Sequence, residues 1–238
     1  MLPESRDPTH CPQGRCSVCR VRSVSVCAAL DRSELDRLEA LAENAVFAGK
    51  TTMLMQGDPA DAVYTITEGT ARLYRLLPDG RCQIVRFLLP GDFIGLSLSE
   101  HYAFSADAVE PVAACRFGRS AFSGLVDRMP HLLRRLHEAA THELTLAQDH
   151  MVLLGRRTAE EKVAAFLLGL RKRLGHLGRS TVMLHLPMTR QDIADYLGLT
   201  LETVSRTFSK LAGDKVILVV RNGIQVLNPR RLEDLAAA

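Results

Sequence analysis

The sequence predicts an α+β protein with an N-terminal β-roll, a long helix after it, and a C-terminal winged helix-turn-helix. Three observations predict this order. Apolar residues repeat with a period of two between residues 51 and 117, and then at steps of four and three between residues 133 and 154. Two capped helical segments and a hairpin signal follow from residue 189 onward. At 238 residues, the chain is long enough for two domains with their own cores.

The chain divides into four predicted parts. Residues 1–30 are a cysteine-rich arm, residues 31–129 the β-roll, residues 130–155 the long helix, and residues 156–238 the helix-turn-helix domain. The arm shows no regular apolar period. After it, leucines at helical spacing predict a short helix over residues 33–44.

The β-roll is predicted from short apolar runs that glycines separate at intervals of 12, 11 and 11 residues. Asp79 and Gly80 supply a hairpin turn between two of these runs. The expected strands are residues 51–55, 63–67, 70–77, 82–89, 105–109 and 113–117.

The long helix carries a heptad seam. Its apolar residues alternate steps of four and three, which is the a and d pattern of a coiled coil. Small alanines in the seam favour close approach of two helices, so we expect a homodimer; packing of this helix against the β-roll is the alternative. The predicted seam is Leu133, His137, Ala140, Leu144, Ala147, Met151 and Leu154. A second helix, over residues 159–174, is expected after a hinge at Gly155.

Residues 189–211 predict a helix-turn-helix. Thr189 can cap the first helix, with Asp192 three residues on, as a capping box requires. Gly198 ends this helix and Thr200 caps the second. The apolar residues expected to bury one face of the second helix are Val204, Phe208 and Leu211.

The opposite face of the second helix is polar, at the spacing i, i+3, i+4 and i+7, and would meet a DNA major groove. A glutamate can accept from a cytosine amine and an arginine can bond a guanine edge. A solvated helix pair with scattered charge is the alternative. The predicted DNA-contacting residues are Thr189, Arg190, Thr200, Glu202, Ser205, Arg206 and Ser209. Apolar runs at 216–220 and 224–227 flank Asn222-Gly223, a strong hairpin signal that predicts the wing.

Charge and composition agree with a DNA-binding domain at the C-terminal end. Residues 156–238 carry 14 Lys and Arg against 8 Asp and Glu, a net charge of +6, whereas residues 1–155 carry −3. No apolar run is long enough for a transmembrane helix, and the first residues lack a secretory h-region, so we expect a cytoplasmic protein. Signatures of serine hydrolases, P-loop proteins, zincins and dinucleotide-binding enzymes are absent, so we expect no enzyme.

Cysteines crowd the predicted arm. Cys16 and Cys19 are separated by two residues, and Cys27 follows after seven more, which is typical of a metal-cluster arm. Three local thiolates leave a cubane iron–sulfur cluster one ligand short. Basic residues interleave with them, and no Asp or Glu occurs between residues 8 and 30, which favours thiolates. Alternatives are a zinc site that also uses His10 and Cys11, and Cys11 as a replacement cluster ligand.

The order of β-roll, long helix and winged helix resembles the cyclic-AMP receptor protein superfamily over nearly the whole chain. The motif Gly91-Asp-Phe-Ile-Gly95 is similar to its β-roll signature, the cyclic-nucleotide-binding jelly roll. The run from Leu199 to Arg206 resembles the FNR branch, whose Glu-x-x-Ser-Arg face reads inverted repeats of the TTGAT…ATCAA kind; Glu202, Ser205 and Arg206 match that face.

The resemblance also implies a cofactor. The FNR family takes its fourth ligand from a cysteine on a β-roll strand, and Cys115 stands at that place. A 4Fe–4S cluster held by Cys16, Cys19, Cys27 and Cys115 is therefore expected, and Cys82 is expected to be a small core residue. The seven-residue second loop resembles alphaproteobacterial FNR-like proteins.

Two departures argue against a cyclic nucleotide ligand. Cyclic-nucleotide binders of the superfamily place a glutamate after the glycine motif and an Arg-Ser pair on the next strand. This chain has Leu96 at the first position and Phe104-Ser105 at the second. A phenyl ring cannot neutralise a buried phosphate.

These features together predict an oxygen-sensing transcription regulator that dimerises, binds a palindromic DNA site and contacts RNA polymerase, the latter through the turn at residues 78–81. A regulator of the same fold without a cluster, sensing a small ligand, haem or thiol redox state, is the first alternative. A zinc-stabilised architectural DNA-binding protein is the second.

Overall fold

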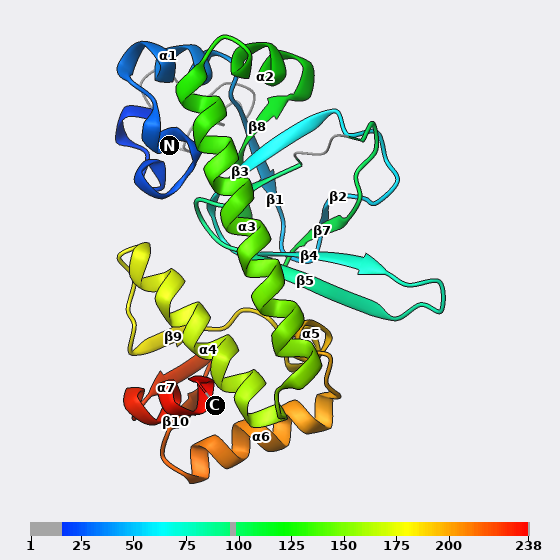
Figure 1. Ribbon diagram of the computed structural model, residues 1–238, viewed down its shortest axis with the longest axis vertical. Helices are drawn as coiled ribbons and strands as arrows, with labels where there is room; N and C mark the ends of the chain where they lie inside the picture. The colour runs from blue at the N-terminus through cyan, green and yellow to red at the C-terminus, as the bar shows by residue number, and fades with distance from the viewer. Residues whose placement is uncertain (1–15, 96–98, 238) are drawn as a thin grey trace, which may run out of the picture. The chain divides into compact units, whose positions relative to one another are not determined.

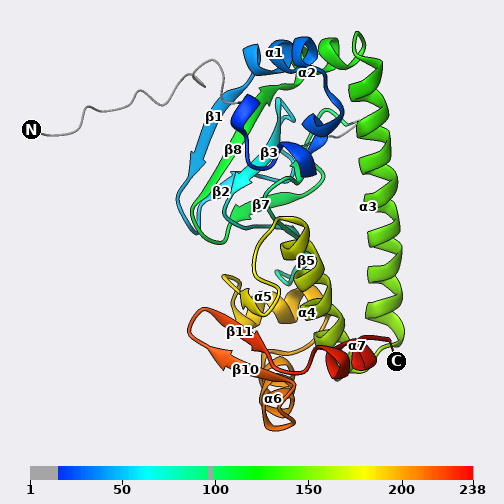
Figure 2. The same cartoon turned by 90° about the vertical axis from the view of Figure 1, so that its left-hand side faces the viewer.

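The computed structural model describes residues 16–95 and 99–237, and the chain forms two compact units. The first unit comprises Met1–Arg75 and Phe87–Thr141, and the second comprises Leu76–Arg86 and His142–Ala238. Each unit is described below by itself. Figures 1 and 2 trace the elements of both.

The first unit begins with three 3-10 turns, η1 (Cys16–Val18), η2 (Arg22–Val24) and η3 (Val26–Ala29), and then helix α1 (Arg32–Ala40). Asp31 caps α1 in a capping box with Glu34, whose side chain accepts from the Asp31 backbone N–H. The predicted helix over residues 33–44 was too long, because residues from Glu43 onward pair with a strand instead.

The predicted β-roll is confirmed as two four-stranded sheets, with strand orders β1-β8-β3-β6 and β2-β7-β4-β5. All six predicted strands form, and two strands were missed, β1 and β6. The strands are β1 (Glu43–Phe47), β2 (Thr52–Leu54), β3 (Ala62–Glu68), β4 (Ala71–Leu76), β5 (Cys82–Leu88), β6 (Phe93–Ile94), β7 (Ser105–Ala108) and β8 (Val112–Gly118).

The two faces of strand β3 bury different cores. Ala62, Tyr64 and Ile66 point into the roll. Val63 points the other way, into a second core that also contains Val26 of the arm, Leu35 of α1 and Leu132. Figures 1 and 2 show the arm, drawn in dark blue, beside this outer face of the sheet. The arm is therefore packed onto the roll by apolar contacts.

Helix α2 (Arg119–Val126), which was not predicted, leads into the long helix α3 (Pro130–Arg156). The first turns of α3 bury Leu132 and Leu136 in the core beside the arm. The predicted seam lies on a neighbouring face, where Leu133 is 55% and Met151 62% exposed. Six of the seven seam residues are exposed and Leu154 is half-buried.

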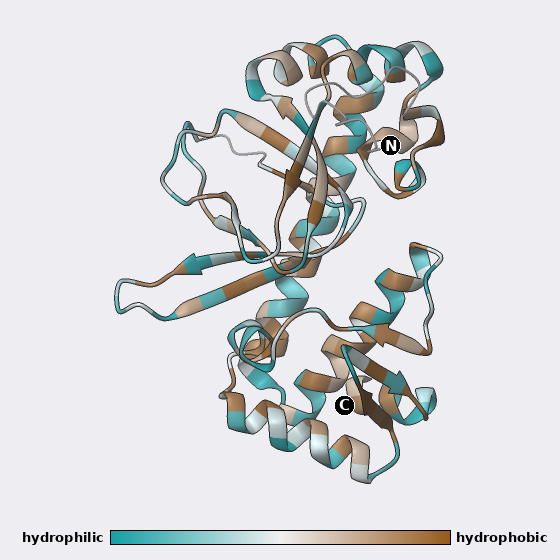
Figure 3. Ribbon diagram, turned by 180° about the vertical axis from the view of Figure 1, so that it is seen from behind, coloured by the Kyte–Doolittle hydropathy of each residue, from teal (hydrophilic) through white to brown (hydrophobic). Residues whose placement is uncertain are grey.

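The C-terminal part of the second unit is a winged helix-turn-helix, as predicted. Thr158 forms a capping box with Glu161 at the start of α4. Its elements are α4 (Ala159–His176), β9 (Met183–His185), α5 (Arg190–Leu197), α6 (Leu201–Gly213), β10 (Ile217–Val220), β11 (Gly223–Val226) and α7 (Pro229–Ala237). Strand β9 and helix α7 were missed from the sequence. Strand β10 consists of apolar residues and is brown in Figure 3.

The wing hairpin differs from its prediction in one detail. Val220 pairs with Gly223, so the two turn residues are Arg221 and Asn222, and Asn222 has φ of 63°. Gly223 is instead the first residue of β11. A Cβ there would lie 2.2 Å from the Leu184 carbonyl oxygen, so this glycine permits the close approach of β9.

Among the described residues, no helix is both long and apolar enough to cross a membrane.

Candidate cofactor cavity and nucleic-acid interface

Four cysteines from distant parts of the sequence line one cavity of the first unit. Cys16, Cys19 and Cys27 come from the arm, and Cys115 comes from strand β8. About 360 Å³ of atom-free space lies among the lining residues, a figure that includes open solvent. Its other lining residues are Val21, Arg22, Ser25, Leu35, Leu38, Thr65, Thr67 and Phe117.

The 3-10 turns of the arm bring its three cysteines to this cavity. The Ser25 hydroxyl caps η3 by accepting from the Cys27 backbone N–H at 3.3 Å. The Arg22 guanidinium donates to the Leu30 carbonyl at 3.3 Å, which closes the arm into a compact loop. Val26 and Leu30 are buried at 3% exposure each, so apolar packing contributes to holding this loop on the roll.

Strand pairing fixes the position of Cys115. In the central ladder of the first sheet, Cys115 lies opposite Asn44 of β1 on one side and Thr65 of β3 on the other. Side chains alternate along a strand, so Cys115 shares its face with Phe117, on the side of the sheet that the arm covers.

The electrostatics of the cavity suit thiolates bound to a cationic centre. Burial raises the pKa of the Cys27 thiol, while the hydrogen bond to Ser25 opposes that shift and Arg22 acts in the same opposing direction. No described lining residue is acidic. A cation bound at the cavity would favour the thiolate of Cys27.

The donor set fits an iron–sulfur cubane better than a single ion. Across the described ranges, no three His, Cys, Asp or Glu side chains converge closely enough to hold one metal ion. A cubane takes one thiolate at each of four irons, so its ligands surround a cavity rather than meet at one point. Four thiols around one cavity, with no carboxylate, match that requirement. The alternative ligands His10 and Cys11 lie outside the described residues.

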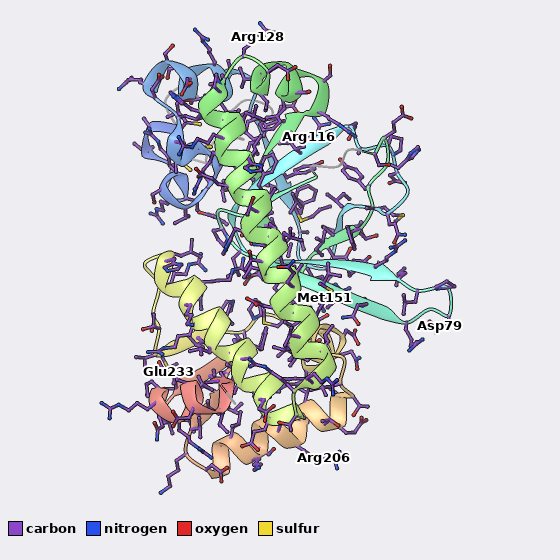
Figure 4. All side chains as sticks on the ribbon, viewed as in Figure 1. Asp79, Arg116, Arg128, Met151, Arg206 and Glu233 are labelled. Carbon is purple, nitrogen blue, oxygen red and sulfur yellow. The ribbon has the colours of Figure 1, made fainter. Side chains whose placement is uncertain are left out.

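The second unit presents the predicted DNA-reading face on α6. The Thr200 hydroxyl caps this helix by accepting from the Thr203 N–H at 3.2 Å. The predicted buried face is confirmed: Val204, Phe208 and Leu211 are at most 2% exposed. The four side chains of the predicted reading face are all exposed, namely Glu202, Ser205, Arg206 and Ser209. Figure 4 shows Arg206 on the outer side of α6.

The carboxyl of Glu202 is held in its charged form. Backbone hydrogen bonding at the start of α6, followed by the Thr200 hydroxyl, lowers the pKa of Glu202. A carboxylate only accepts hydrogen bonds, which is what pairing with a cytosine amine requires.

Helix α5 supports the reading helix. Thr189 caps it by accepting from the Asp192 N–H at 3.1 Å, and Asp192 accepts from the Thr189 N–H at 2.8 Å. Gly198 ends it with φ of 60°. The Arg190 guanidinium lies 3.3 Å from the centroid of the Phe208 ring, and burial lowers the pKa of Arg190. Arg190 thus also has a packing role between α5 and α6 that the sequence did not indicate.

One interaction and one residue of the sites were missed. Lys210, near the end of α6, forms an ion pair with Glu160 of α4. Thr65 lines the cysteine cavity but was considered only as part of a strand. Period-two alternation places Thr65 on the same face of β3 as Val63, and this signal could have identified it.

Comparison with known proteins agrees with both units. Residues 45–129 match the family model of the cyclic nucleotide-binding domain, and residues 161–235 match that of the Crp-like helix-turn-helix domain. The transcriptional activatory protein AadR of Rhodopseudomonas palustris is 49% identical over 97% of both chains. The nitrogen fixation regulation protein FixK of Bradyrhizobium diazoefficiens is 51% identical over 95% of this chain and 96% of its own.

Two further comparisons extend this similarity. The transcriptional activator protein FnrL of Cereibacter sphaeroides is 39% identical over 85% of this chain and 84% of its own. The solved structure of FixK2 from Bradyrhizobium japonicum superposes with a TM-score of 0.77 at 38% identity, covering 83% of this chain and 98% of FixK2. These relatives are regulators and not enzymes, as predicted for this chain. Because their identity extends over most of its length, the chain belongs to the FNR branch of the CRP/FNR superfamily of DNA-binding transcription regulators.

Proposed function

We propose that this protein is an oxygen-responsive transcription activator that binds TTGAT…ATCAA inverted repeats as a homodimer. In this proposal, Cys16, Cys19, Cys27 and Cys115 hold a 4Fe–4S cluster. The names of AadR and FnrL describe them as activators, which supports the direction of regulation.

The observation that carries the proposal is the shared cavity of the four cysteines. Three come from a short arm and the fourth from a strand far along the chain, and they meet at one place. When bound, the cluster would supply an oxygen-labile iron–sulfur centre. Leu35, Leu38 and Phe117 shield the cavity with apolar surface, and Arg22 supplies positive charge beside the thiolates.

The exposed seam of α3 supports dimerisation. Leu133, Leu144 and Met151 are each more than half exposed, which is unusual for three apolar side chains along one stripe of a helix. A second copy of α3 would cover them in a coiled coil. The reading helix of each copy would then meet one half of a palindromic site.

Contact with RNA polymerase is proposed at the tip of the β4–β5 hairpin. Asp79 and Arg81 are exposed there and form an ion pair at 2.7 Å. Figure 4 shows Asp79 at the end of this hairpin. The pair fixes the shape of the turn and presents both charges to a partner.

The test is metal analysis of protein purified strictly without oxygen. We expect about four iron and four acid-labile sulfide per chain, with a brown colour that air removes. Serine at Cys16, Cys19, Cys27 or Cys115 should abolish this loading. Cys82→Ser is the matched control, because Cys82 lies on β5 and does not line the cavity.

Other outcomes discriminate the alternatives. A full cluster in Cys115→Ser would overturn the ligand assignment and make Cys11 the candidate. Protein without iron or sulfide would instead be a cluster-free regulator of this fold, sensing a small ligand, haem or thiol redox state. Zinc in place of iron would indicate a zinc-stabilised arm.

A further inference from the structure

Thr65 is a buried hydroxyl without a hydrogen-bond partner at the wall of the cysteine cavity. Its residue exposure is 3%, and its Oγ1 atom is buried and makes no hydrogen bond within the described residues. A buried hydroxyl left in this state destabilises a fold, and most such groups in native proteins find partners. An acceptor on a bound group would give this hydroxyl a hydrogen-bond partner.

Its position identifies where that acceptor would lie. Thr65 is directly opposite Cys115 in the antiparallel ladder of β3 and β8, and both side chains line the cavity. Directly opposed residues have Cβ atoms about 4.5–5.5 Å apart. Anything bound to the Cys115 thiolate would thus come within reach of the Thr65 hydroxyl.

Thr65 is a polar residue among apolar neighbours on this face of the sheet. Along the same face, Val63 and Phe117 are apolar and form an opposed pair at 1% and 2% exposure. Valine would satisfy the strand preference and the packing at Thr65 equally well, since it has the same branched shape. Threonine differs from it only by the hydroxyl, and this residue lines the cavity.

We propose that the Thr65 hydroxyl donates a hydrogen bond to sulfur of the bound cluster, at or beside Cys115, and so slows the release of iron. This inference rests on the proposed function. A hydrogen bond to an anionic sulfur is charge-assisted, and hydrogen bonds to sulfur are among the groups that tune iron–sulfur clusters. Thr65 is not a ligand; it stabilises the thiolate and sulfide charge that the ligands create.

The test compares three variants loaded anaerobically: Thr65→Val, Thr65→Ser and Thr70→Val. Thr65→Val removes the hydroxyl and keeps the shape, whereas Thr65→Ser keeps the hydroxyl. Thr70→Val makes the same chemical change at another buried threonine of the roll, which does not line the cavity. The readout is the rate at which a ferrous chelator removes iron without oxygen.

We expect Thr65→Val to lose iron about fivefold faster than wild type or more, as befits one hydrogen bond to a charged group. Thr65→Ser and Thr70→Val should stay within about twofold of wild type. A second readout separates this role from packing. In the metal-free protein, Thr65→Val should be at least as stable to denaturant as wild type, because it removes an unsatisfied buried hydroxyl.

Thr65→Val should therefore not lower the denaturant stability of the metal-free protein, although it speeds iron release from the loaded protein. If Thr65 had only a packing role, the substitution would not have these two different effects. Equal iron release by wild type and Thr65→Val would overturn the inference and leave the cluster in place. Equally fast release by Thr65→Ser and Thr65→Val would overturn it too, because shape and not the hydroxyl would matter. Wild type that binds no cluster would remove the proposed function and this inference together.

Discussion

Arg206 lies on the exposed face of α6, four residues after Glu202. We predict that Arg206→Ala removes a bidentate guanine contact worth about 1–3 kcal/mol. The loss should relax the preference at one base pair of each half-site rather than weaken binding to all DNA. Competition binding with matched sites and sites substituted at each position measures this preference.

Lys215→Ala is the control for that prediction. Lys215 is exposed just after α6 and would contact phosphate, so its loss should weaken binding to every sequence and reduce the salt dependence. Lys210 is a poorer control because it pairs with Glu160. A uniform loss of affinity in Arg206→Ala would show that α6 docks differently from our proposal.

We expect His150 to make the stability of the second unit depend on pH. Its ring stacks on Tyr196 with centroids 4.3 Å apart. Burial lowers the pKa of His150 below its usual value, and the positive charge of Lys162 acts in the same direction. The unfolded chain therefore takes up a proton at a higher pH than the folded chain does. The unfolded His150 has a pKa of about 6.5, so its contribution to the free energy of unfolding is fully present above that pH. This contribution declines as the pH falls from about 6.5 through the lower pKa of the folded state.

We predict that His150→Phe keeps the stacked ring and flattens this decline. Denaturant unfolding at several pH values between about 5 and 7.5 measures it. His142→Phe is the matched control, because His142 is on the same helix and exposed. An unchanged pH profile in His150→Phe would assign the decline to other groups.

At the scale of elements, α3 shows what periodicity can and cannot decide. The heptad spacing identified the apolar stripe from Leu133 to Leu154, and that stripe is exposed except at its end. Leu132 and Leu136 form a second stripe beside it, and these two residues enter the core. Both stripes have helical spacing, so the sequence could not tell which one packs on the first unit and which remains exposed.

We predict that Ala140→Leu strengthens the proposed dimer. Ala140 is exposed in the seam, and the larger side chain would add apolar burial of about 1–2 kcal/mol per helix if it packs without a clash. The variant should dimerise and bind DNA in air at a concentration at which wild type does neither. Sedimentation of both aerobic proteins at equal concentration measures this. Firm dimers of both, with equal DNA affinity, would show that dimerisation is not the switch.

Two glycines of the second unit, Gly223 in the wing and Gly169 in α4, should respond oppositely to substitution by alanine. Gly223→Ala should destabilise the second unit, by about 1–3 kcal/mol as overpacking usually does, because the new Cβ meets the Leu184 carbonyl. Gly169→Ala, in the exposed middle of α4, has open space around its Cβ and should stabilise the unit by about 0.5–1 kcal/mol. Denaturant unfolding measures the change in the free energy of unfolding of each variant relative to wild type. Equal stability would contradict the close approach of β9 to β11.

Over the whole molecule, the sequence predicted elements with strong local signals and missed those that depend on distant partners. Strand β1 forms because Glu43–Phe47 pairs with β8, more than sixty residues later, and nothing in its own residues required a strand. Strand β9 likewise depends on β11. In the cysteine cavity, local spacing identified the arm, whereas Cys115 came from family resemblance and Thr65 only from the register of β3.

The roll is predicted to bind no cyclic nucleotide even though it matches the cyclic nucleotide-binding domain. Phe104 is half-buried where binders have an arginine. The Ser105 hydroxyl is buried and accepts from the Gln56 N–H at 2.9 Å, so it already has a partner within the roll. Leu96 lies outside the described residues. Titration calorimetry with cyclic AMP should show no saturable heat at micromolar ligand; clear saturation there would contradict this prediction.

The packing of the arm has a consequence for substitutions far from any sulfur atom. Val26 and Leu30 anchor the arm in a core that also contains residues of α1 and α3. The positions of Cys16, Cys19 and Cys27 therefore depend on apolar contacts in that core as well as on the arm's own turns. A substitution that loosens this core would displace the cysteines of the arm without changing any of them.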